Sequence, residues 1–121
     1  MKDISTDYNW FKIAEALNEL TFSAGGFTEV EVNNRKLCIS RFKENLFACS
    51  ATCPHAGGRL AEGYIDVLGN IVCPVHRYKF SLAHGRNTSG EGYHLRTFPV
   101  EIRDDGIFVG FKEKNFFDPL K

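Results

Sequence analysis

The sequence predicts a small all-β protein. Apolar and polar residues alternate over several short runs, as they do in strands that bury one face. Residues that favour tight turns separate these runs. The 121 residues include 11 Phe, 4 Tyr and 11 Gly, a composition typical of strands joined by many turns. This length favours one domain, and with 43% hydrophobic residues the chain can bury a core.

The first half of the chain is expected to form a strand followed by a three-stranded meander. The first strand covers 9–13, and a turn of helix or a loop follows over 14–20. The meander has turns at Asn33-Asn34 and at 43–45, where the residue types tolerate left-handed backbone or short loops. Its three strands are predicted over 27–32, 36–42 and 46–50.

The second half is expected to hold shorter strands and to end in a hairpin. The residues Asp104-Asp105-Gly106 predict the turn of that hairpin. Five strands are predicted here, over 64–67, 71–72, 77–82, 95–103 and 107–112.

Two short motifs carry the chemistry. Cys53-Pro54-His55 and Cys73-Pro74-Val75-His76 give the spacing C-x-H, 17 residues, C-x-x-H. Two thiols and two imidazoles form a metal-ligand set, and two centres suit it: a [2Fe–2S] cluster, or a tetrahedral zinc site. Zinc fingers usually pair Cys with Cys and His with His. Here each loop holds one Cys and one His. This arrangement favours a two-iron centre in which each iron is bound by one residue from each loop.

This pattern resembles the Rieske family. The resemblance covers the two ligand loops, 53–63 and 73–80, then Gly85 and Phe98-Pro99-Val100, and extends from Trp10 to Phe111. It implies a Rieske-type small β-sandwich or barrel with an inserted cluster-binding subdomain. The expected division is a single Rieske domain with its base at 9–51 and 95–112, the insertion at 52–94 and a tail at 113–121.

The resemblance also implies a role for each ligand residue. Cys53 and Cys73 would bind one iron as thiolates, and His55 and His76 the other as imidazoles, with one [2Fe–2S] cluster per chain. Leu60 would shield the cluster.

Four positions differ from those of high-potential Rieske proteins. Gly58 and Val75 stand where such proteins carry two disulfide-bonded cysteines. Tyr78 and Phe80 stand where they carry a Ser and a Tyr that donate hydrogen bonds toward sulfur; Phe80 cannot donate, and the geometry of Tyr78 is unfavourable. We therefore expect a potential near the low end of the roughly −150 to +300 mV range of Rieske centres.

The function implied is that of a one-electron carrier, a soluble ferredoxin between a reductase and a terminal oxygenase or similar enzyme. The chain is not expected to be an enzyme by itself, because little sequence follows 112 to build a domain for a mononuclear iron. Two alternatives stay open: the small subunit of a nitrite-reductase-like enzyme, and a structural or regulatory metal-binding protein that holds zinc. Charge disfavours a nucleic-acid partner, because 15 basic and 15 acidic residues balance. With no run near the ~20 apolar residues of a membrane span and no signal peptide, a cytoplasmic location is expected.

The remaining candidates have simpler interpretations. Cys38 and Cys49 lie in runs expected to pair as a hairpin, and we expect them to be buried thiols and not a disulfide. His84 and His94 lie outside the ligand spacing and are expected at the surface. Four cations could form a basic rim for an acidic partner, although ordinary solvated charge is the favoured interpretation: Arg59, Arg77, Lys79 and Arg86. The tail holds Phe116-Phe117, which either packs back or binds a partner.

Overall fold

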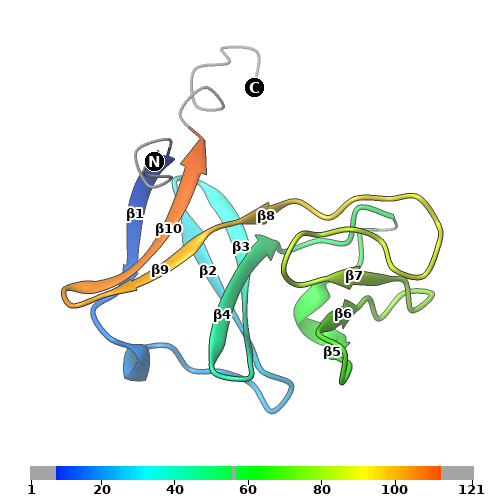
Figure 1. The fold of residues 1–121 in the computed structure, drawn as a ribbon, viewed down its shortest axis with the longest axis horizontal. Coiled ribbons are helices and arrows are strands. Elements are labelled where there is room, and N and C mark those ends of the chain that lie inside the picture. Colours follow the sequence, from blue (N-terminus) through cyan, green and yellow to red (C-terminus); the bar gives the residue numbers. More distant parts are fainter. Residues whose placement is uncertain (1–7, 56, 113–121) are drawn as a thin grey trace, which may run out of the picture.

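The structure is a computed structural model that describes residues 8–55 and 57–112. The described residues form three antiparallel sheets and two short 3₁₀ turns, as the all-β prediction requires (Figure 1). No helix in these segments is long and apolar enough to cross a membrane. The expected tail at 113–121, with Phe116-Phe117, lies outside the described residues.

The first sheet joins the two ends of the described chain. It has three strands in the order β1 (Tyr8–Ala14), β10 (Gly106–Lys112) and β9 (Val100–Arg103). Its β9–β10 hairpin turns at the predicted Asp104-Asp105 pair. The predicted helical turn after β1 is the 3₁₀ turn η2 (Leu17–Glu19), which is one turn long.

The second sheet contains the predicted meander. Its order is β2 (Phe27–Val32), β3 (Arg35–Phe42), β4 (Asn45–Ser50) and β8 (Thr97–Phe98). Asn33 and Asn34 take left-handed conformations, with φ of 54° and 64°, and so close the β2–β3 hairpin as predicted.

The prediction of one strand over 95–103 is wrong. The structure has two strands there, β8 and β9, which lie in different sheets on either side of Pro99. Proline has no backbone N–H to donate to a neighbouring strand. The chain can therefore leave one sheet and enter the other at Pro99 without leaving a backbone donor unpaired. The Pro99 carbonyl still accepts a bond from the Gly110 N–H at 3.0 Å.

The third sheet lies at the other end of the molecule (Figure 1). It contains β5 (Tyr64–Ile65), β6 (Asn70–Val72) and β7 (Lys79–Ser81) in sequence order. The predicted strand over 64–67 stops at Ile65, because the Asp66 carboxylate accepts bonds from the N–H groups of Leu68 and Asn70, each at 3.0 Å, and closes a turn. The predicted strand over 77–82 begins only at Lys79.

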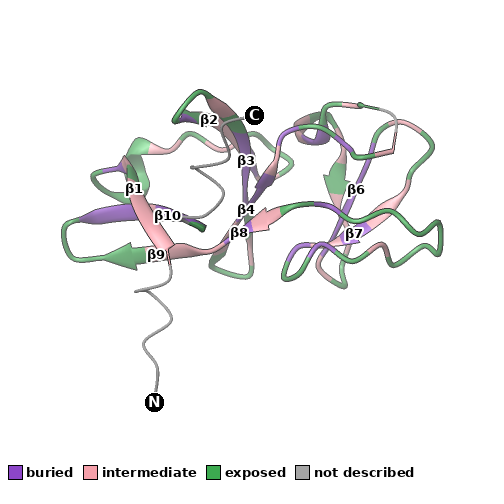
Figure 2. Cartoon of the chain, turned by 90° about the horizontal axis from the view of Figure 1, so that it is seen from above, coloured by how far each residue is buried: buried purple, intermediate pink, exposed green. Residues whose placement is uncertain are grey.

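Strand β3 places the core on both of its faces. Four consecutive residues, Leu37 to Ser40, are buried, so β3 has no exposed face there (Figure 2). One face packs in a cluster between the first two sheets: Val32, Leu37, Ile39, Ala48, Phe98, Val109 and Phe111. The alternate residue, Cys38, belongs to a second cluster that joins the meander to the third sheet: Phe27, Cys38, Cys49, Cys53, Leu60, Ile71, Cys73, Phe80, Leu82 and Leu95. The second cluster is therefore the packing that attaches both motif cysteines to the meander.

Candidate metal centre

Two loops that share one backbone hydrogen bond carry the predicted ligands. The first follows β4 and leads to the 3₁₀ turn η3 (Leu60–Glu62), and the second connects β6 to β7. In the first, the Cys53 N–H donates to the Gly58 carbonyl at 2.7 Å. In the second, the Cys73 N–H donates to the Tyr78 carbonyl at 2.9 Å. Each loop is thus closed on its cysteine by a backbone bond to the residue five positions later.

The four predicted ligand residues gather where these loops meet. Cys53 and Cys73 are 3% and 0% exposed, and their side chains interact. The rings of His55 and His76 lie beside each other, with centroids 5.0 Å apart. His55 is half-buried and His76 is exposed. The structure therefore puts two thiols inside and two imidazoles toward the surface.

The His55 Nδ1 atom tests whether these residues fit a metal ion. It is buried and has no hydrogen-bond partner among the described residues. A buried polar atom without a partner is costly, because it has lost its bonds to water. A metal ion at this nitrogen would restore the lost interaction, so the donor set fits a metal centre.

The sulfur of Cys73 has a backbone hydrogen-bond donor and a glycine close to it. It accepts a bond from the Val75 N–H at 3.4 Å. Burial raises the pKa of the Cys73 thiol to about 11, so the metal-free protein keeps a proton there that metal binding would release. A Cβ at Gly58 would lie 3.2 Å from this sulfur and 2.7 Å from Val75 Cγ2, so with Val75 opposite it a side chain at position 58 would force a shift of one of the two loops.

Apolar side chains exclude water behind the cysteines. Leu60 and Phe80 are fully buried in the same cluster as Cys53 and Cys73. Leu60 is therefore buried with the motif cysteines, and its shielding of a cluster stays a prediction. Phe80 offers no donor, and no described bond runs from the Tyr78 hydroxyl to either sulfur.

Tyr78 and Tyr93 flank His55. The Tyr78 ring stacks on the His55 ring at 4.0 Å between centroids and 24° between planes. Tyr93 lies 5.2 Å from His55 and 5.8 Å from Tyr78. The sequence motif pointed to Tyr78, but only as a doubtful donor to sulfur. Tyr93 was missed, because it lies in a loop without regular spacing and no local pattern marks it.

The ligand geometry is that of two pairs. The two thiols interact with each other, and the two imidazole rings lie beside each other. A two-iron centre with two Cys on one iron and two His on the other takes its protein ligands in such pairs.

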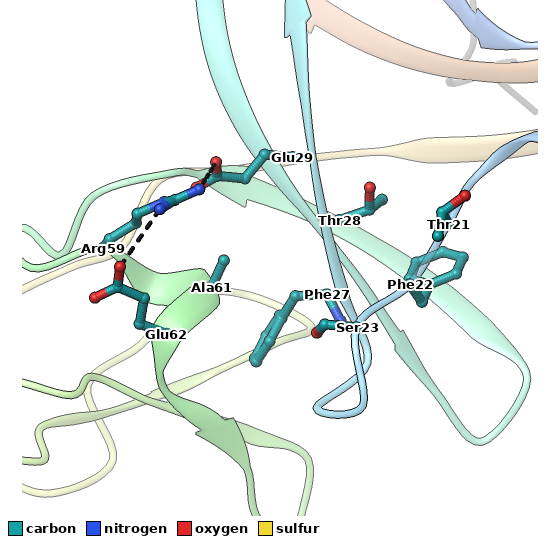
Figure 3. A pocket seen from close by; sticks show the side chains of 9 residues that line it. All are labelled: Thr21, Phe22, Ser23, Phe27, Thr28, Glu29, Arg59, Ala61 and Glu62. Atoms are coloured by element: carbon teal, nitrogen blue, oxygen red, sulfur yellow. Dashed lines mark hydrogen bonds and ion pairs between the residues drawn. The ribbon is translucent and has the colours of Figure 1, made fainter.

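Arg59 attaches the first ligand loop to the meander (Figure 3). Its Nε and Nη2 donate to the two carboxylate oxygens of Glu29 on β2 at 3.0 and 2.8 Å, and its Nη1 lies 3.4 Å from Glu62. This bidentate pair lowers the pKa of Glu29. Beside it opens a cavity of about 550 Å³ between the loop before β2 and η3.

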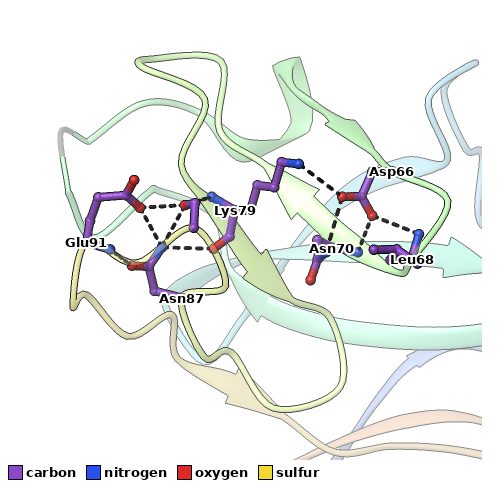
Figure 4. Close-up of polar contacts among 7 residues, drawn as sticks. Asp66, Leu68, Asn70, Lys79, Asn87 and Glu91 are labelled. Atoms are coloured by element: carbon purple, nitrogen blue, oxygen red, sulfur yellow. Dashed lines mark hydrogen bonds and ion pairs between the residues drawn. The ribbon is translucent and has the colours of Figure 1, made fainter.

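The four cations of the suggested basic rim differ in their ion pairs. Arg59 is paired as described, and Lys79 lies 3.8 Å from Asp66 (Figure 4). Arg77 and Arg86 are exposed and have no ion pair with any described residue. Arg59 and Lys79 thus lie in ion pairs, and both interpretations of the four cations stay predictions. His84 and His94 are exposed, as expected.

Cys38 and Cys49 face each other across the β3–β4 ladder. Both are buried, both are free thiols, and their side chains interact. The predicted burial and hairpin pairing are confirmed.

The chain is similar in sequence to known proteins. The chain is similar to the ferredoxin component of the alkene monooxygenase system of Xanthobacter autotrophicus, 22% identical over 80 residues, which are 66% of each protein. It is also similar to the 3-phenylpropionate/cinnamic acid dioxygenase ferredoxin subunit of Photorhabdus laumondii, 26% identical over 91 residues, 74% of this chain and 86% of that protein. The chain thus spans just under two thirds of the length of the first relative.

Solved structures show the same fold. One is a chain from a complex of reduced oxygenase and oxidised ferredoxin in carbazole 1,9a-dioxygenase, with a TM-score of 0.69 and 27% identity over 84% of this chain and 92% of that one. Another is described as a putative NADH-dependent nitrite reductase small subunit from Mycobacterium tuberculosis, with a TM-score of 0.72 and 18% identity over 86% and 96%. The model of the Rieske [2Fe-2S] domain matches residues 9–99. The chain therefore belongs to the Rieske [2Fe-2S] domain family.

Proposed function

We propose that this protein is an electron-transfer component that holds one [2Fe–2S] cluster through Cys53, Cys73, His55 and His76. The observation that carries the proposal is the buried Nδ1 of His55, which has no hydrogen-bond partner among the described residues, in a pair of loops that also hold a second imidazole and two buried thiols. When bound, the cluster supplies reversible one-electron chemistry. We further propose that the chain acts as a single domain, with base and insertion divided as the sequence predicts.

The residues of the chain would divide the work as follows. The two cysteines would bind as thiolates and neutralise iron charge inside the core. The two histidines would bind as neutral imidazoles, which carry less negative charge than thiolates and make reduction easier. Leu60 and Phe80 keep water from the sulfurs, while the Val75 N–H stabilises negative charge on the Cys73 sulfur.

We propose a reductase as electron donor and a terminal oxygenase as acceptor. The support is that both curated relatives are ferredoxin components of oxygenase systems. A cytoplasmic location fits the facing thiols of Cys38 and Cys49, which a reducing compartment keeps unbonded.

Nitrite reductase is the second candidate. Its support is the fold shared with the putative small subunit. Purification of the native protein with its partners separates the two: an oxygenase and a flavin reductase support the first, and a sirohaem protein supports the second.

Anaerobic purification followed by absorption spectroscopy and iron and sulfide analysis tests the ligand assignment. The expected result is a red-brown protein with two irons and two sulfides per chain, the content of one cluster. Cys53→Ser and Cys73→Ser should lose the spectrum. The matched controls are Cys38→Ala and Cys49→Ala, which remove buried cysteines of the same core cluster and should keep it. A colourless zinc protein, or an unchanged spectrum in the first two variants, would overturn the assignment.

A further inference from the structure

Two buried thiols lie outside the ligand loops. Cys38 on β3 and Cys49 on β4 are 0% and 3% exposed. They are direct partners in the antiparallel β3–β4 ladder. Residues opposite each other in such a ladder have Cα atoms about 4.5–5.5 Å apart, within the roughly 4.4–6.8 Å that a disulfide bond spans. The backbone therefore already places these two cysteines at a separation that a disulfide requires.

Neighbouring strands hold both cysteines in this position. Cys38 pairs on its other side with Glu29 of β2, and Cys49 pairs with Thr97 of β8. Each cysteine thus lies in a strand with a partner on both sides, so the sheet fixes the distance between the two Cα atoms. Both side chains pack in the second core cluster, on the same face of the meander.

The two thiols also interact directly. A hydrogen bond between them lowers the pKa of Cys38 and raises the pKa of Cys49, while burial raises the pKa of both. The hydrogen bond therefore helps one sulfur of the pair to lose its proton while the other keeps its own. Because the thiolate is the nucleophile in disulfide chemistry, one cysteine can attack an oxidant and the other can then complete the bond.

We propose that Cys38 and Cys49 form a redox modification site, where an oxidant of the disulfide class, RSSR, closes a reversible bond between β3 and β4. One cysteine thiolate attacks RSSR, breaks its S–S bond, forms a mixed disulfide and releases RS⁻. The second cysteine loses its proton, attacks the mixed disulfide and releases the other RS⁻. In sum, two cysteine thiols lose two electrons and two protons, and RSSR takes them up as two RSH.

The bond fastens the strand that leads into the first ligand loop. Cys49 comes four residues before Cys53, and both lie in the second core cluster. A covalent link between β3 and β4 restricts the unfolded chain and so stabilises the folded one. The oxidised protein should therefore resist urea better than the reduced protein.

Incubation of the full chain in mixtures of reduced and oxidised glutathione, continued until the composition stops changing, tests the site. Acid quenching, alkylation of the remaining thiols in urea and peptide mass spectrometry report the state of each cysteine. As the share of oxidised glutathione rises, free Cys38 and free Cys49 should be lost together. A cross-linked peptide, lighter than its two parts by two hydrogen atoms, should appear, and dithiothreitol should remove it. Cys53 lies in the same tryptic peptide as Cys49, so fragmentation between them assigns the bond.

Urea unfolding followed by circular dichroism measures the effect of the bond. The wild-type midpoint should shift to higher urea after oxidation and return after reduction. Cys38→Ala and Cys49→Ala each leave one thiol without its partner, so the midpoint of each variant should be the same in both states. Each variant is compared with itself, so the loss of a buried side chain does not affect the result.

Three results would overturn the inference. In the first, both thiols stay open to alkylation after incubation in oxidised glutathione alone. In the second, Cys38 or Cys49 keeps a bound glutathione and no cross-link forms. In the third, the wild-type midpoint does not move on oxidation, or moves equally in Cys49→Ala. The proposed function is tested separately, because it fails if the protein holds no cluster with a Rieske spectrum, whatever the state of Cys38 and Cys49.

Discussion

At the scale of single residues, two glycines with similar positive φ differ in the space around them. Their substitution by alanine therefore distinguishes the cost of a steric clash from the cost of left-handed backbone. Gly85 and Gly90 have φ of 77° and 92°. A Cβ at Gly85 would lie 1.9 Å from the Leu95 carbonyl oxygen, whereas one at Gly90 would meet nothing within 4 Å.

Gly85→Ala should therefore destabilise the protein more than Gly90→Ala. Left-handed backbone costs a non-glycine residue about 1–2 kcal/mol, and this is the whole cost expected for Gly90→Ala. Overpacking adds about 1–3 kcal/mol for Gly85→Ala. Urea unfolding followed by circular dichroism measures both, and equal losses would show that the contact with Leu95 carries no cost.

The Glu29–Arg59 pair predicts a pH effect on stability. The Arg59 guanidinium holds the pKa of Glu29 below its ordinary value of 4.5. A carboxyl with a lowered pKa in the folded state stabilises the fold above its unfolded pKa, and this contribution is lost as the pH falls through the folded pKa.

Glu29→Gln should therefore lower the urea midpoint at neutral pH, and its difference from wild type should shrink below pH 4.5. Glu31→Gln, an exposed change on the same strand, is the control. A Glu29→Gln deficit that stays constant down to pH 3 would mean that the ion pair does not contribute.

At the scale of elements, the hairpin at Lys43-Glu44 carries conformational strain. These residues have φ of 50° and 66°, conformations that Asn and Gly tolerate better than Lys and Glu. Glu44→Gly should stabilise the protein by about 0.5–1 kcal/mol, since it removes the left-handed penalty of a residue with a Cβ. Asn34→Gly, in the neighbouring hairpin, should gain less. A loss of stability in Glu44→Gly would contradict this account.

The elements also show how far sequence reasoning reaches. The range 27–32 was predicted exactly, because alternation and flanking turn residues agree there. The break at Pro99 was not anticipated, because Phe98-Pro99-Val100 looks continuous in sequence and only the sheets on either side require the change. The second ligand loop was placed correctly, yet His76 and Arg77 take left-handed φ of 65° and 61° and delay β7. Arg77 thus takes a left-handed backbone conformation that glycine adopts at no steric cost.

At the scale of the whole molecule, the site depends on contacts that sequence spacing does not contain. The candidate ligands were found from the two motifs alone. The covering of His55 by Tyr93 and the bond from Arg59 to Glu29 join residues far apart in the chain, and only the packed structure brings them together. β3, buried on both faces, connects the meander core to the cluster of residues behind the cysteines.

The potential is a property of this whole arrangement. Tyr78 stacks on His55, Phe80 lacks a donor, and Gly58 and Val75 carry no disulfide. Protein-film voltammetry should therefore give a midpoint near the low end of the roughly −150 to +300 mV Rieske range. A midpoint potential near the upper end of this range would mean that hydrogen-bond donors other than residues 78 and 80 stabilise the reduced cluster.

Pulsed electron paramagnetic resonance on the reduced protein, grown with ¹⁵N-labelled histidine, tests the central claim most directly. If His55 and His76 bind the cluster, two ¹⁵N couplings to the unpaired electron will appear, and each of His55→Cys and His76→Cys will remove one. His84→Gln and His94→Gln, which change exposed histidines, will leave both couplings in place. A reduced cluster without ¹⁵N coupling, or a protein without a paramagnetic signal, would contradict the assignment of a centre with two Cys and two His ligands.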